Sequence, residues 1–122
     1  MSSHEPLPLK DLAPSDQLAL AALLRLLVRL DGRFTDGEQE ELGDLALAMG
    51  ERRFWQVMDE AAQTLPDEAG IREAAKRVTD QDARELLYVA LVRVAESDVI
   101  QSSEAGLLEW LRSEWNIVEG EA

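Results

Sequence analysis

Four carboxylates beside two short polar loops are the residues of this chain best suited to chemistry. Asp31 and Glu38 flank the first loop, and Asp98 and Glu104 flank the second. Hard cations such as Ca²⁺ and Mg²⁺ take about six or more oxygen ligands, so the four residues are candidate metal ligands if the loops converge. The alternative is structural. An aspartate in a turn bonds to nearby amides, and a glutamate at a helix start complements the helix dipole. The residues alone leave both readings open.

Other arrangements that would indicate catalysis or a known metal loop lack their components in this sequence. There is no cysteine and a single histidine, His4, so thiolate chemistry, a catalytic triad and a histidine-based metal site are excluded. An EF-hand counted from Asp31 fails as well. Its third, fifth and twelfth positions need oxygen donors and a terminal glutamate, but they hold Arg33, Thr35 and Leu42. We therefore expect that the protein is not an enzyme.

The charge of the chain restricts its partners. Twenty-five acidic residues against 12 basic ones give a formal net charge of −13 in 122 residues. Such a surface repels phosphate backbones, which argues against nucleic acid and favours cations or basic protein partners, although it can also serve solubility alone. The most apolar stretch, Leu18 to Leu30, is interrupted by Arg25 and Arg29 and is shorter than the roughly 20 residues that span a membrane. With no basic and apolar leader at its start, the chain is expected to be cytoplasmic and not inserted in a membrane.

The spacing of apolar residues predicts six helices and no strand. Five of the helices are expected at 16–30, 52–63, 67–77, 80–96 and 102–115. The remaining one starts at the capping box formed by Thr35 and Glu38 and ends before Gly50. Ser15 and Thr79 are the expected caps of the helices at 16–30 and 80–96, which should lie at the centre of the bundle because they are apolar almost all round. We expect a flexible lead-in at 1–14, one helical domain at 15–117 and an acidic tail at 118–122.

The two halves of the chain resemble each other. A shift of 66 residues places Glu104 on Glu38 and Ile100 on Phe34. The same shift aligns further apolar pairs, namely Leu108 with Leu42, Leu111 with Leu45, Leu86 with Leu20 and Val94 with Val28. Each half reads as a long apolar helix, a short loop with one central hydrophobe and an acidic helix start. This repeat predicts a compact all-α bundle built from two related helix–loop–helix halves.

The segment Arg29-Leu30-Asp31-Gly32-Arg33-Phe34-Thr35-Asp36-Gly37-Glu38, followed by Leu42, resembles the Asp-Gly-x-hydrophobe-x-x-x-Glu signature of the TerB-like, tellurite-resistance family. The resemblance covers about residues 16–117. The second copy keeps Ile100 and Glu104 but has Ser97 in place of the aspartate and Asp98 in place of the glycine. The resemblance implies an all-helical bundle with acidic side chains on one face, and a link to chemical stress through metal ions or protein partners.

Three tryptophans are the remaining candidates for binding. Trp55 follows Phe54 directly, so the two side chains point about 100° apart on a helix and are not both expected in the core. An exposed tryptophan suits a protein interface, and the alternative is partial burial at a helix edge. Our leading expectation is a non-enzymatic TerB-like stress-response or accessory module that acts through protein contacts. The second is a divalent-cation domain that uses the acidic loops.

Overall fold

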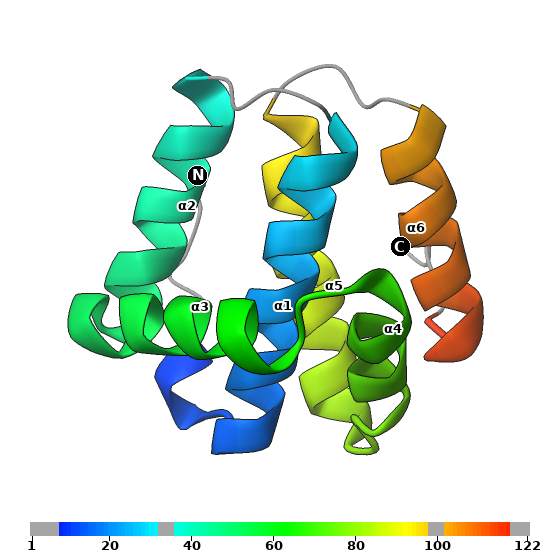
Figure 1. The fold of residues 1–122 in the computed structure, drawn as a ribbon, viewed down its shortest axis with the longest axis horizontal. Coiled ribbons are helices and arrows are strands. Elements are labelled where there is room, and N and C mark those ends of the chain that lie inside the picture. The colour runs from blue at the N-terminus through cyan, green and yellow to red at the C-terminus, as the bar shows by residue number, and fades with distance from the viewer. Residues whose placement is uncertain (1–7, 32–35, 98–101, 118–122) are drawn as a thin grey trace.

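The computed structural model describes residues 8–31, 36–97 and 102–117, and every regular element within them is helical (Figure 1). A single 3-10 turn, η1, precedes six α-helices. The bounds are Leu9–Asp11 (η1), Pro14–Asp31 (α1), Asp36–Met49 (α2), Glu51–Thr64 (α3), Glu68–Lys76 (α4), Gln81–Glu96 (α5) and Ser102–Glu114 (α6). These elements confirm the predicted all-α bundle of six helices. None of the helices in the described part of the chain is long and apolar enough to cross a membrane.

The core is built around α1, which contacts α3, α4, α5 and α6. Its leucines Leu20, Leu23, Leu24 and Leu27 are fully buried, because helices surround it on most sides. The second expected central helix, α5, packs against α1, α2 and α6. One side of α5 faces solvent, where Val89 is 41% exposed. The central position of α1 is therefore confirmed, whereas α5 is central on one side only.

The second helix of each half packs on the first helix of the other half. Contacts join α2 to α5 and α6 to α1, and α6 also contacts α5. Figure 1 shows α2 and α6 on opposite sides of the central pair. The helices α3 and α4 connect the halves and pack on α1. This exchange of helices is the arrangement that two related helix–loop–helix units produce when each covers the apolar face of the other.

The expected caps of two helices, α1 and α5, are wrong. The helix α1 begins at Pro14, one residue before Ser15, since the fixed φ of proline suits the first turn of a helix. The cap of α5 is Asp80, whose Oδ2 accepts the N–H of Ala83 at 2.9 Å, in place of Thr79. The break at Gly50 is confirmed: its φ of 105° turns the chain between α2 and α3.

The last part of the expected lead-in is packed on the domain. Leu9 is fully buried, and η1 contacts α2. The amide Nε2 of Gln17 donates to the carbonyl of Leu9 at 3.0 Å, and Nε of Arg53 donates to Oε1 of Gln17 at 2.8 Å. These two bonds join η1, α1 and α3. The residues of η1 therefore pack on the helical bundle, and apolar periodicity did not indicate this because one 3-10 turn has no period to detect.

Candidate functional site

Two of the four predicted metal ligands, Glu38 and Glu104, occupy equivalent places in the two halves. Each is the third residue of its helix, α2 or α6, and each is only 1% exposed. A carboxylate in the first turn of a helix is stabilised by the positive end of the helix dipole. Of the other two, Asp98 and the side chain of Asp31 lie outside the described residues. The burial of both glutamates was not expected from the sequence.

The structure brings the starts of α2 and α6 to the same end of the bundle as the ends of α1 and α5 (Figure 1). Gly37, at the start of α2, lies against the backbone carbonyl of Ser97, which follows α5. On the other side, Oγ of Ser103 in α6 donates to the carbonyl of Leu30 in α1 at 3.0 Å. The two contacts are near-equivalents under the 66-residue shift. Each contact joins the start of the second helix of one half to the end of the first helix of the other half.

Buried carboxylates are stable only when polar groups compensate for the loss of water. Both Glu38 and Glu104 have interactions within the chain. Oε2 of Glu104, taken as a single atom, is buried and accepts no hydrogen bond in the structure. Across residues 8–31, 36–97 and 102–117, no group of three histidine, aspartate or glutamate side chains is placed to hold a metal ion. The described residues therefore supply two buried carboxylates at the same end of the bundle, one on α2 and one on α6 (Figure 1).

The three tryptophans have three different environments. Trp115 is fully buried, and its indole N–H donates to the carbonyl of Ala75 at 2.9 Å. Trp110 is half-buried, and the guanidinium of Arg72 lies 4.5 Å from its ring centre in a cation–π contact. Trp55 is 51% exposed. Trp115 is thus a core residue, and Trp55 is the tryptophan available to a partner.

The exposure of Trp55 follows from its place on α3. Phe54 points into the core and is fully buried, and the neighbouring ring of Trp55 meets it edge-on with centroids 4.8 Å apart. The prediction that the two are not both buried is confirmed. Leu47, which is 69% exposed near the end of α2, lies three residues before the corner at Gly50. Two large apolar side chains are therefore in water on either side of the α2–α3 corner.

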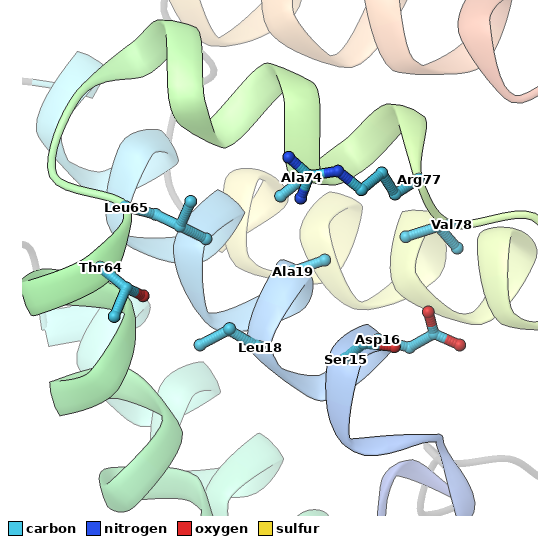
Figure 2. Close-up of a pocket in the computed structure, with 9 residues that line it drawn as sticks. All are labelled: Ser15, Asp16, Leu18, Ala19, Thr64, Leu65, Ala74, Arg77 and Val78. Carbon is cyan, nitrogen blue, oxygen red and sulfur yellow. The ribbon is translucent and has the colours of Figure 1, made fainter.

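A hollow of about 270 Å³ lies where the start of α1 meets the end of α3 and the helix α4 (Figure 2). Its apolar lining comes from all three segments and consists of Leu18, Ala19, Leu65, Ala74 and Val78. Its polar lining consists of Ser15, Asp16, Thr64 and Arg77. Sequence reasoning missed this hollow because segments far apart in the chain form it. Asp16 lies in the first turn of α1 and Arg77 directly follows α4, so the apolar periodicity of the sequence did not single out either residue.

The two charged groups of the hollow differ in surroundings. Partial burial, and then the nearby carboxylate of Asp80, raise the pKa of Asp16 above its ordinary value. Within the described residues, neither the carboxylate of Asp16 nor the guanidinium of Arg77 takes part in a hydrogen bond or ion pair. In contrast, Arg72 and Lys76 in the same helix, α4, pair with glutamates. The hollow therefore carries one anion and one cation that the described protein groups do not neutralise.

Comparisons with protein-family models, with curated proteins and with solved structures find no match to this chain. The resemblance to the TerB-like family consequently rests on the segment from Arg29 to Glu38 and stays a prediction. The structure offers three candidate functional features: the buried glutamates at the starts of α2 and α6, the α2–α3 corner and the hollow.

Proposed function

We propose that the chain is a non-enzymatic, TerB-like module that acts through protein–protein contacts as a cytoplasmic stress-response or accessory protein. The observation that carries the proposal is the 51% exposure of Trp55 on α3. Tryptophan is enriched among the few residues that supply most of the binding energy of an interface, because a partner removes its large apolar surface from water. The link to stress comes from the family resemblance of the Asp31 to Glu38 segment.

The surroundings of Trp55 have the composition of an interface. Leu47 adds a second exposed apolar side chain across the corner at Gly50. Arg52 and Asp59 are exposed and lie three residues before and four residues after Trp55, so they share its face of α3. An apolar centre with charged groups at its edge is the usual arrangement of protein interfaces. A net charge of −13 favours a partner with a basic surface.

The test is co-purification with three forms of the chain as bait: wild type, Trp55→Ala and Val89→Ala. Val89 is a matched control, since it is 41% exposed on α5 and lies outside the α2–α3 corner. We expect a discrete partner with the wild type and with Val89→Ala, and its loss with Trp55→Ala. Circular dichroism melts of all three forms establish that the fold is kept. A partner bound equally by Trp55→Ala, or no partner above an empty bait, contradicts the proposal.

Divalent-cation binding is the second candidate function, and one observation favours it. The buried carboxylates of Glu38 and Glu104 stand in the first turns of α2 and α6, whose starts contact the ends of α5 and α1 at one end of the bundle. The ion would be Ca²⁺ or Mg²⁺, because carboxylate oxygens are hard ligands. The other two ligands of this candidate, Asp31 and Asp98, belong to the parts of the site that the structure does not describe.

Thermal melts with and without millimolar Ca²⁺ or Mg²⁺ test the second candidate. A ligand at a hundredfold excess over its Kd stabilises the native state by about 2.7 kcal/mol, which raises the Tm of a domain of this size by several degrees. The expected shift disappears in Glu38→Gln and in Glu104→Gln, each compared with its own melt without metal, and persists in Asp44→Asn. An equal shift in all forms, or none in the wild type, rejects a metal site.

A further inference from the structure

The hollow between α1, α3 and α4 has the features of a small-ligand site rather than of a packing defect (Figure 2). Ligand sites are concave and mainly apolar, with a few polar groups that fix orientation. Five of the nine lining side chains are apolar, and two of the remaining four carry opposite charges. Its volume of about 270 Å³ suits a molecule with few non-hydrogen atoms.

The charged groups lie toward different parts of the hollow. In Figure 2 the side chain of Arg77 runs back along α4, so that its guanidinium lies beside Ala74. The carboxylate of Asp16 lies instead on the side of Val78. Apolar side chains of Ala19 and Leu65 line the space with them. A ligand that satisfies both charges must therefore carry its own two charges apart, with an aliphatic portion between them.

We propose that this hollow binds a small linear zwitterion whose ammonium and carboxylate groups are separated by an aliphatic chain, as in ω-amino acids. The carboxylate pairs with the guanidinium of Arg77, whose planar donors suit two carboxylate oxygens. The ammonium pairs with Asp16, and its charge also offsets the repulsion between Asp16 and Asp80. The aliphatic chain covers Leu18 and Val78, which are part of the apolar lining.

Charge complementarity distinguishes this class from its neighbours. A simple fatty acid satisfies Arg77 but places an apolar end beside the carboxylate of Asp16. An aliphatic amine pairs with Asp16 but places an apolar end beside the guanidinium of Arg77. We expect an α-amino acid, which carries both charges on one carbon, to pair with only one of the two groups. Only separated charges match all parts of the lining, and this match is independent of the proposed partner surface around Trp55.

The probe is 6-aminohexanoate, and leucine is the matched control because the two are isomers with the same charges and differ in where the charges sit. Titration of the ¹⁵N-labelled full chain at low ionic strength is followed by NMR. We expect saturable shifts at millimolar 6-aminohexanoate at the amides of Ala19, Leu65 and Ala74, and none with leucine, hexanoate or hexylamine.

Two variants test which protein group binds each end of the ligand. Asp16→Asn and Arg77→Gln each raise the Kd by about fivefold or more, because each removes one charge-assisted hydrogen bond. The exposed controls Asp44→Asn and Arg52→Gln leave the Kd unchanged. Trp55→Ala also leaves it unchanged, which separates this site from the proposed function. Amide spectra report whether each variant is folded. Equal binding of leucine, binding of hexanoate that Asp16→Asn does not alter, or the absence of saturable shifts overturns the proposal.

Discussion

Gly37 and Ser97 touch backbone to backbone where the start of α2 meets the end of α5. A Cβ on Gly37 would collide with the carbonyl oxygen of Ser97 and lie 3.3 Å from its carbonyl carbon. A carbonyl cannot rotate away as a flexible side chain can. The absence of a side chain at residue 37 therefore decides how closely the two halves approach at the end that carries Glu38 and Glu104.

Gly37→Ala is expected to lower the free energy of unfolding by about 1–3 kcal/mol, because the helices must separate to admit the methyl group. The control is Gly43→Ala in the same helix, where a Cβ meets no atom within 4 Å. Alanine there should raise stability by about 0.5–1 kcal/mol, because alanine loses less backbone conformational entropy than glycine when the chain folds. Urea unfolding followed by circular dichroism compares the two. Equal changes of the same sign would contradict the close contact.

Gln17→Met is expected to destabilise the domain by about 1–3 kcal/mol. Gln17 is 5% exposed and bonds both to the carbonyl of Leu9 and to Arg53, so methionine leaves two polar groups without this partner while keeping a similar volume. Gln56→Met on the exposed side of α3 should change stability by less than about 0.5 kcal/mol. Urea denaturation of both variants measures the difference. A loss no larger than that of the control would show that η1 is not held by Gln17.

Trp115→Phe is expected to cost about 2 kcal/mol or more of stability. The smaller ring leaves a void in the core, and the carbonyl of Ala75 loses the indole N–H that lies 2.9 Å from it. The same substitution at the exposed Trp55 should stay within about 0.5 kcal/mol. Guanidinium unfolding of the two single variants checks the contrast, and similar losses would place Trp115 outside the core.

Asp16→Asn is expected to stabilise the domain at neutral pH, by less than about 1 kcal/mol because Asp16 is only partly buried. Burial and Asp80 raise the pKa of Asp16 in the folded state. The folded state thus binds this proton more tightly than the unfolded state does, and ionisation of Asp16 weakens the fold as pH rises. The advantage of the variant should shrink as pH falls through that pKa. Melts at several pH values test it, with Asp44→Asn as the exposed control, and a pH-independent difference would contradict it.

The helices could be predicted from the sequence because each has a strong apolar period. Leu107, Leu111 and Trp115, for example, recur every four residues, and all three are buried. The ends of helices were less predictable. The helix α1 begins at Pro14, before the expected cap Ser15, and Asp80 caps α5 in place of the adjacent Thr79, because neighbouring residues can each start a helix and the packed chain selects one.

The candidate sites were predictable only in part. Glu38 and Glu104 were recognisable as equivalent carboxylates at helix starts, yet no local pattern indicated that both side chains would be buried. The neighbouring positions of Phe54 and Trp55 required one of them to face outward, and packing on α1 selects Phe54 for the core. The hollow beside Arg77 depends on how the start of α1, the end of α3 and the helix α4 pack together, and the spacing of apolar residues does not encode that packing.

The exchange of second helices between the halves bears on how the chain acquires its structure during synthesis. Ser103 and Leu30, which join α6 to α1, are 73 residues apart in sequence. The inner side of α2 likewise rests partly on α5, which the ribosome makes much later. Part of the apolar side of α2 therefore stays uncovered until α5 has emerged, and the bundle closes only after α6 has been made. Contacts between such distant residues also slow folding relative to a bundle in which each helix packs on its immediate neighbour.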